Sequence, residues 1–368
     1  MDYTTLSQIL FNHLDWHPAR IKTFAQLTIA LIMSGSVTLK HLAQGFQTES
    51  KLDSVHRQIQ RFLKNQIIDF HWFGMMIREF MGLNGKFYVA LDRTNWDFGV
   101  FHINFLFITV VFGKVSIPIV WMLLDKKGNS NTSERIDLMR KFLKIIPADQ
   151  IIALLGDREF IGYDWFQFLE RQNIMYVMRI KSNTQMKHKN GGMVDAKLIF
   201  AHLKINEYLQ MDTKIWGLKV QVIGLKLPNG ELLILASTRN IAIDVLEAYR
   251  DRWPIERTFL CLKTKGFNFE RTHIKDNDKL AKLMAIAVLA LSICVKVGAI
   301  LNEENPIKIK KHGRKLYSLF TYGIDWIKRL LLNKCCNKYD NIKSKILSDT
   351  KINKKNKEYI KSPTLAAS

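Results

Sequence analysis

Residues 104–124 read NFLFITVVFGKVSIPIVWMLL, two apolar runs joined by Gly113 and Lys114. Both runs are rich in β-branched and aromatic residues, a composition typical of buried strands. The link between them is short enough for a hairpin. Residues 87–91 (FYVAL) have the same character. The sequence therefore predicts three neighbouring strands.

Helix and strand patterns alternate after this hairpin. We predict, in order, a helix capped by Ser133 over residues 133–146, a strand over 151–155, a helix over 163–172 and a strand over 175–180. This order is typical of an α/β core with a mixed sheet.

Residues 181 to about 240 break that rhythm. Polar loops are followed by strand patterns at 219–227 and 231–237, joined by Pro228-Asn229-Gly230, a good hairpin signal. We interpret this stretch as a β-rich insertion. Helical patterns resume at Ile243 and continue to about Asn302, so residues 85–302 form one predicted core with its insertion.

The two ends of the chain differ from this core. Residues 1–84 have helical patterns, whereas residues 303–368 are basic, with a charge cluster at 308–315 (KIKKHGRK). We expect a basic C-terminal helical region there, ending in a disordered tail that is rich in Lys and Asn.

Two short helical patterns, at residues 36–46 and 51–64, surround a turn. In the second, Val55, Ile59, Phe62 and Leu63 share one face. The opposite face carries Ser54, Arg57, Arg61 and Lys64. This layout suits a helix-turn-helix that contacts DNA with its second helix, and it suits equally a small bundle with a solvated basic face.

The net charge of +22, from 55 Lys+Arg against 33 Asp+Glu, favours a polyanion as partner. Neutralising phosphates releases counterions, the main source of non-specific DNA affinity. The alternative is a basic protein with no nucleic-acid role. With 48% hydrophobic residues, the chain has enough apolar side chains for a large core.

No feature predicts a membrane or secreted location. The most apolar stretch, residues 283–295 between Lys282 and Lys296, is shorter than the ~18 residues of a membrane span, so we expect a buried core helix. The first 17 residues lack an apolar signal segment, and the four cysteines contain no C-x-x-C pair. We expect a soluble protein in a reducing cytoplasm.

Two acids directly follow predicted core strands: Asp92 after FYVAL, and Asp157 after IIALLG. Strand ends of an open α/β sheet deliver side chains to a shared crevice. Carboxylates bind hard divalent cations, and two such ions hold both oxygens of a phosphodiester exchange. Taken alone, each aspartate is more often a turn or capping residue. Asp97 and Glu159 are rival carboxylates at less favourable positions.

Residues 248–265 read AYRDRWPIERTFLCLKTK. On a continuous helix, Tyr249, Arg252, Glu256 and Lys263 share one face within about 60°. Such a face would combine a metal-binding acid with phosphate-binding cations. A solvated charged face is the alternative, and Pro254 weakens the assumption of continuity.

The spacing Tyr249-x2-Arg252-x3-Glu256-x6-Lys263 resembles the Y-R-E-K signature of bacterial insertion-sequence transposases of the IS-four group. Residues 91–96 (LDRTNW) and 156–160 (GDREF) resemble the segments that carry the group's two catalytic aspartates. The similarity extends from about Lys86 to Tyr322. Three ordered motifs in the right context are a specific match.

This resemblance implies an RNase H-like core, an α/β fold, with Asp92, Asp157 and Glu256 as catalytic metal ligands. Mg²⁺ would be the cofactor, with Mn²⁺ as a substitute. The implied activity is cleavage at transposon ends followed by strand transfer into target DNA, performed by a homodimer on double-stranded terminal inverted repeats. Tyr249, Arg252 and Lys263 would contact DNA near the transferred end.

Weaker expectations concern neighbouring residues. Trp216 would stack on a flipped base, although a half-buried strand tryptophan is commoner. Arg93 would meet a phosphate or form a surface ion pair, and Trp253 would pack in the core. Two alternatives stay open: an RNase H-like nuclease or resolvase without strand transfer, and a DNA-binding repressor without catalysis.

Overall fold

The computed structural model describes residues 3–188, 191–238, 243–311, 313–333 and 345. The apolar runs of the sequence form a three-stranded antiparallel meander: β1 (Phe87–Phe98), β2 (Phe101–Phe112) and β3 (Val115–Leu123). Gly113, with φ of 60°, provides the left-handed residue that the tight β2–β3 link requires. Residues 103–110 of β2 are all buried, which explains why this stretch is mostly apolar.

Two parallel strands extend the meander, β4 (Ile151–Gly156) beside β1 and β5 (Tyr176–Arg179) beside β4. The strand order β3-β2-β1-β4-β5, with β2 antiparallel to its neighbours, is that of an RNase H-like core. The predicted mixed α/β fold is confirmed.

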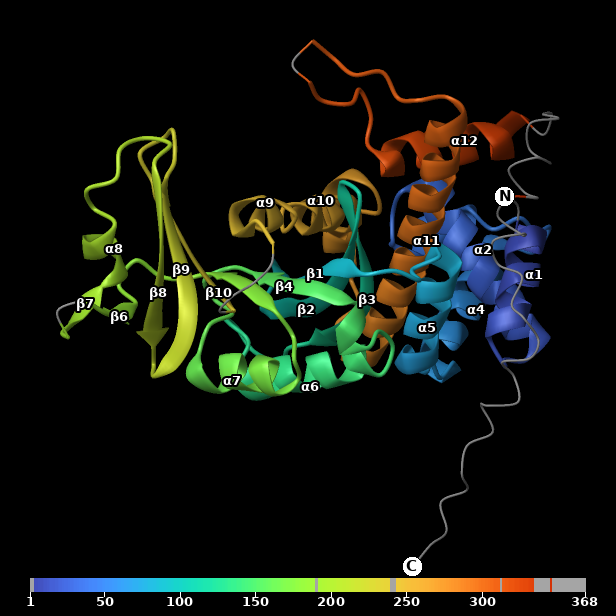
Figure 1. The fold of residues 1–368 in the computed structure, drawn as a ribbon. Coiled ribbons are helices and arrows are strands. Elements are labelled where there is room, and N and C mark those ends of the chain that lie inside the picture. Colours follow the sequence, from blue (N-terminus) through green and yellow to red (C-terminus); the bar gives the residue numbers. More distant parts are fainter. Residues whose placement is uncertain (1–2, 189–190, 239–242, 312, 334–344, 346–368) are drawn as a thin grey trace, which may run out of the picture.

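Helices cover both faces of the sheet (Figure 1). α6 (Thr132–Leu143) and α7 (Tyr163–Arg171) lie on one face, and α9 (Val245–Arg250) and α10 (Pro254–Leu260) on the other. The predicted cap of α6 is wrong by two residues. Asn131, not Ser133, caps the helix, and it forms a reciprocal capping box with Glu134.

The region predicted as an insertion is rich in strands, but it is continuous with the core sheet. It contains β6 (Gln185–Lys187), β7 (Met193–Asp195), α8 (Ala196–Ile199), β8 (Tyr208–Ile215), β9 (Leu218–Lys226) and β10 (Leu232–Thr238). β10 pairs with β5 and gives one sheet of eight strands, ordered β3-β2-β1-β4-β5-β10-β9-β8. The predicted hairpin at Pro228-Asn229-Gly230 is present, with Gly230 at φ 81°.

Five N-terminal helices pack at the β3 end of the sheet: α1 (Tyr3–His13), α2 (Pro18–Ser34), α3 (Leu39–Gln44), α4 (Leu52–Asn65) and α5 (Phe70–Met81). α3 and α4 are the helix pair expected from the sequence. Their apolar residues belong to the same continuous core as the sheet. The predicted division at residue 84 therefore does not correspond to a break in the hydrophobic core.

α11 (Asn277–Glu304) runs between the N-terminal helices and the sheet. Among the described residues it is the one helix long and apolar enough to cross a membrane, but 94% of its most apolar window is buried inside the protein. The expected buried core helix is thus confirmed, although it is far longer than the apolar stretch that predicted it. Before α11, short polar links interrupt the helical region that was predicted to run from Ile243 to about Asn302.

α12 (Leu319–Asn333) packs across α11. The two backbones approach so closely that a Cβ on Gly323 would lie 1.8 Å from the carbonyl oxygen of Cys294. The predicted disordered tail lies outside the described residues.

Candidate active site

Asp92 and Asp157 lie side by side because their strands are neighbours. The parallel pairing of β1 with β4 ends at Leu91 and Gly156, so each aspartate is the next residue beyond that ladder. Asp92 does not follow its strand, as the sequence predicted. It lies inside β1, which continues to Phe98 because its second half pairs with β2.

Glu256 reaches the same pocket from α10. The helix containing it is not continuous with α9, since the chain turns at residues 251–253 and α10 begins at Pro254. A proline at the first helical position needs no backbone N–H partner, which explains this restart. The prediction that one continuous helix carries Tyr249, Arg252, Glu256 and Lys263 is therefore wrong.

A buried hydroxyl fixes α10 to the sheet. Thr258 Oγ1 donates to the carbonyl oxygen of Ser116 at 2.7 Å and accepts from the Ser116 N–H at 3.0 Å. Both groups lie in the core, so the contact holds the helix against β3. Glu256 lies two residues before this anchor.

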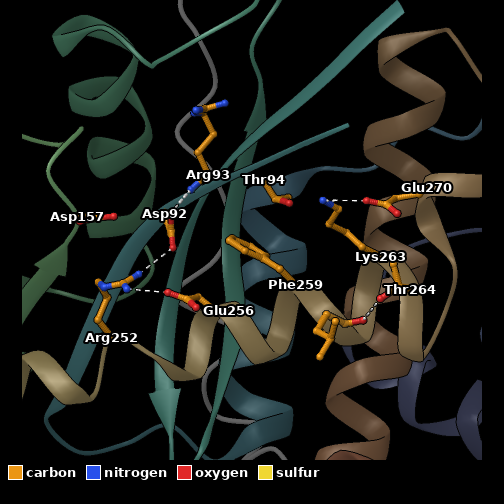
Figure 2. A pocket seen from close by; sticks show the side chains of 11 residues that line it. Asp92, Arg93, Thr94, Asp157, Arg252, Glu256, Phe259, Lys263, Thr264 and Glu270 are labelled. Atoms are coloured by element: carbon orange, nitrogen blue, oxygen red, sulfur yellow. Dashed lines mark hydrogen bonds and ion pairs between the residues drawn. The ribbon is translucent and has the colours of Figure 1, made fainter. Parts of the chain in front are cut away.

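Figure 2 shows Asp92, Asp157, Arg252, Glu256 and Lys263 around one pocket. Asp92 lies in β1, Asp157 directly follows β4, Arg252 lies in a turn, Glu256 in α10 and Lys263 in the π-helical turn Cys261–Lys265. Tyr249 is absent from the pocket lining. Its ring lies behind Arg252, whose guanidinium is 5.5 Å from the ring centroid.

Arg252 bridges two of the three acids. Its Nη1 donates to Asp92 Oδ2 at 3.2 Å, and its Nη2 donates to Glu256 Oε1 at 2.7 Å. The arginine itself is buried. The fork of the guanidinium therefore occupies one oxygen of each carboxylate.

Burial dominates the ionisation of Asp92. It raises the pKa of this carboxyl to about 7, against the opposing effects of the Arg252 charge and of the hydrogen bond from the Arg93 N–H. Glu159 and Asp157 raise the pKa further. Burial also raises the pKa of Tyr249 to about 12, so its phenol is neutral near pH 7.

Lys263 is held at the opposite end of the pocket. Its Nζ lies 2.9 Å from Glu270 Oε1 and donates to the carbonyl oxygen of Asn95 at 3.1 Å. Glu270 is a pocket carboxylate that sequence reasoning missed, because it follows no strand and belongs to none of the motifs.

Arg93 forms an ion pair rather than a free phosphate contact. Its Nε and Nη2 donate to the two oxygens of Glu159 at 3.3 and 3.2 Å. Its Nη1 also reaches Asn104 at 3.1 Å. The rival acid Glu159 thus has a partner of its own, while Asp97 pairs with His102 at the β1–β2 hairpin.

The basic face of α4 is exposed, as predicted. Val55, Ile59, Phe62 and Leu63 are buried. A separate groove is lined by the exposed residues Ser54, Arg57, Gln60, Arg61 and Lys64. These side chains do not contribute to the carboxylate pocket.

Two tryptophans depart from expectation. Trp216 does not line the carboxylate pocket. It occupies the two-residue β8–β9 turn at φ 50°, packs against Phe166 of α7 and is 38% exposed. A bulky residue in the left-handed region is unusual. The prediction that Trp253 packs in the core is wrong, since it is 58% exposed in the turn that carries Arg252.

Among the described residues, no three His, Cys, Asp or Glu side chains form a ready metal cluster. The donor chemistry of the pocket nevertheless fits a hard cation, since Asp92, Asp157 and Glu256 supply carboxylate oxygens. Two of these acids already share one positive group, Arg252.

The fold and the pocket define an RNase H-like protein whose acids and cations suit phosphate chemistry. The family model described as "Transposase DDE domain" matches residues 103–293, slightly more than half of the chain. The chain belongs to this family and acts in DNA transposition. The matched region includes Asp157 and Glu256 but begins eleven residues after Asp92.

Distant structural likenesses accompany this match. A piggyBac transposase synaptic complex with hairpin DNA has a TM-score of 0.45 and 11% identity, over 99% of this chain and 86% of that chain. The NurA nuclease from Sulfolobus solfataricus has a TM-score of 0.25 and 12% identity, over 69% and 95%. Neither likeness is close enough to bear on function. No curated protein matches the chain.

Proposed function

We propose that this transposase cleaves DNA at transposon ends and joins the freed strand to target DNA, with Asp92, Asp157 and Glu256 as the catalytic carboxylates. The observation that carries the proposal is the convergence of these acids, which are 65 and 99 residues apart in sequence, on one pocket with Arg252 and Lys263. Membership of the IS-four group, with its Y-R-E-K signature, is part of this proposal.

Asp92, Asp157 and Glu256 would hold divalent cations, Mg²⁺ by their chemistry, with Mn²⁺ as a substitute. Bound cations would stabilise the charge on the attacking and leaving oxygens of the phosphodiester. Arg252 would turn from the carboxylates to a phosphate, and Lys263 would leave Glu270 for another. The neutral Tyr249 would orient Arg252 from behind.

DNA would extend beyond the pocket. The groove of α4, with Arg57, Arg61 and Lys64, suits the duplex of a terminal inverted repeat. The exposed Trp253, next to Arg252 in the chain, would stack on a base near the reacting end. Trp216 would meet DNA only if the duplex also passes the β8–β9 turn. We also propose that the protein acts as a homodimer that holds two transposon ends. Its proposed location is the cytoplasm.

The test is an assay of nicking and joining on a labelled transposon end with Mg²⁺. We expect Asp92→Asn, Asp157→Asn and Glu256→Gln each to lower cleavage by at least ~1,000-fold, because each removes a charge that balances the cations. Equilibrium binding of the same DNA should persist, which separates lost chemistry from lost folding. Full cleavage by any one variant contradicts the carboxylate assignment.

The same assay distinguishes the alternative activities. Nicks without joined products would favour an RNase H-like nuclease or resolvase. Binding without nicks by the unaltered protein would favour a repressor. Family membership and the intact set of acids support the transposase instead.

A further inference from the structure

The segment between α11 and α12 carries five cations and no acid. Lys308, Lys310, Lys311, Arg314 and Lys315 lie within eight residues, and the nearest acids in sequence are Glu304 and Asp325. Figure 1 shows this segment extending away from the body of the protein, on the side of the sheet that carries α9 and α10.

The described residues of this segment form a hydrogen-bonded hairpin, which we call the basic hairpin (residues 308–311 and 313–316). The Leu316 N–H donates to the Lys308 carbonyl and the Lys310 N–H to the Arg314 carbonyl, both at 2.8 Å. Gly313, with φ of 77°, closes the turn.

The register of the hairpin gathers cations on one face. Lys310 lies opposite Arg314, and Lys308 is two residues before Lys310. Side chains two residues apart on a strand point to the same face and are ~6.6 Å apart. Lys308, Lys310 and Arg314 therefore form a row on one side of the ribbon.

The base of the hairpin is fixed to the core. The side-chain oxygen of Asn302, near the end of α11, accepts from the Ile307 N–H at 3.2 Å and from Lys315 Nζ at 3.0 Å. Ile307 is buried, and α12, which follows the hairpin in sequence, packs tightly across α11. The hairpin is therefore tied at its base to the packed helices.

Nothing in the described part of the chain neutralises this row. Lys308, Lys310, Lys311 and Arg314 form no ion pair there, and all four are exposed. Elsewhere the pocket cations Arg93, Arg252 and Lys263 all have acidic partners. Like charges this close repel one another unless an anion is bound.

We propose that the basic hairpin is a second DNA contact, which grips the phosphate backbone outside the catalytic pocket without reading sequence. A double helix presents one negative charge per ~1.7 Å of its axis, so a row of three cations meets several phosphates. The inference rests on the proposed function, because it takes DNA as the polyanion. It adds a binding surface that is separate from α4 and from the carboxylate pocket.

The test compares two triple variants in the binding of a mixed-sequence 40-base-pair duplex across a range of salt concentrations. The first is Lys308→Gln, Lys310→Gln and Arg314→Gln together. The matched control is Arg140→Gln, Lys141→Gln and Lys144→Gln, which removes the same charges from exposed positions at α6, on the opposite face of the sheet. Thermal unfolding verifies that both variants fold.

We expect the hairpin variant to bind about tenfold or more weakly at 0.1 M salt, with its log–log salt slope reduced by about 0.9 for each phosphate that the hairpin no longer neutralises. The control should bind like the unaltered protein. Lysine acylation of the unaltered protein, read by mass spectrometry, provides a measurement that needs no variant. DNA should protect Lys308, Lys310 and Lys311 but not Lys141 or Lys144.

Equal affinity and slope for the two variants, with no protection by DNA, overturn the inference and leave the proposed transposase chemistry intact. Unchanged DNA binding with a loss of binding to phosphatidylserine vesicles overturns it in favour of a membrane contact. Failure of the proposed function would be seen differently, as hairpin-dependent DNA binding without cleavage of a transposon end.

Discussion

At the scale of the residue, Arg252 links two of the three acids of the pocket. The sequence interpretation assigned it to phosphate. In the folded chain its fork instead joins Asp92 to Glu256 at 3.2 and 2.7 Å. A buried arginine between two acids satisfies both of them and holds a β-strand residue close to a helix residue.

This arrangement predicts competition between Arg252 and a metal ion. Two unit charges ~4 Å apart interact by ~4 kcal/mol at an effective dielectric constant of 20. Arg252→Gln should therefore bind Mn²⁺ more tightly, by at least about tenfold, in titrations followed by the electron paramagnetic resonance of free Mn²⁺. The titration should be carried out at pH 8.5, because loss of Arg252 raises the pKa of Asp92 further and this carboxyl must be ionised to bind the metal. The exposed Arg257→Gln is the control for overall charge. Equal or weaker binding by Arg252→Gln argues against the competition.

The ionisation of Asp92 predicts a pH dependence for metal binding. With a pKa of about 7, the carboxyl is protonated in acid and unavailable as a ligand. Mn²⁺ affinity should fall by up to about tenfold per pH unit below pH 7 and level off above it. The folded-state pKa of Asp92 lies above its unfolded-state value, so the contribution of this carboxyl to the free energy of unfolding increases as the pH falls. Fold stability and metal affinity should therefore change in opposite directions with pH. An affinity that is flat from pH 5.5 to 8 contradicts the shift.

At the scale of the secondary-structure element, α10 delivers Glu256 through a helix start at Pro254 and an anchor at Thr258. The sequence predicted which residues meet, but the continuous helix that it assumed does not exist. Arg252 lies in the turn before α10, and Lys263 in the π-helical turn after it. All three reach the pocket although no continuous α-helix carries them.

The anchor of α10 is open to a direct test. Thr258→Val keeps the shape of the side chain but leaves the buried Ser116 N–H without a partner, a loss worth ~1–3 kcal/mol. Urea denaturation should show a decrease in stability of this size, and DNA cleavage should slow because Glu256 loses its support. The exposed Thr264→Val, whose hydroxyl makes one long contact at 3.4 Å, should be nearly neutral in stability. Equal stability of the two variants would remove Thr258 from this role.

At the scale of the whole molecule, α11 joins the N-terminal helices to the sheet. Two buried lysines on this helix reach the last turns of its neighbours: Lys282 Nζ donates to the Leu63 carbonyl at 3.1 Å, and Lys296 Nζ to the Phe80 carbonyl at 2.7 Å. A cation at the end of a helix also complements the helix dipole. The groove of α4 is thereby held at a set position relative to the carboxylate pocket.

We therefore predict one cooperative unfolding transition for the described fold. Calorimetric and van't Hoff enthalpies should agree, because α1–α5 and the sheet share one core. Lys282→Met should lower the midpoint of that single transition, since it leaves the Leu63 carbonyl without its donor. Lys279→Met, at a partly exposed neighbouring position, is the control. A separate early transition of the N-terminal helices would show that they form an independent unit.

The sequence by itself was sufficient for several local features of this protein. Apolar runs predicted the strands, the spacing of Val55, Ile59 and Phe62 predicted the buried face of α4, and the strand-following acids predicted a shared crevice. These features depend on neighbours in the chain, so periodicity reveals them.

Only the tertiary structure decided which distant residues are partners. Glu270 with Lys263, Glu159 with Arg93, and Arg252 with both Asp92 and Glu256 are contacts across strand register and helix breaks. The pairing of β10 with β5, which makes the expected insertion part of the core sheet, is of the same kind. Such contacts depend on how the elements pack, and no local pattern encodes them. Asp92 depends on both contributions. The sequence around it predicts an acid close to a strand, whereas the end of the β1–β4 ladder places it beside Asp157.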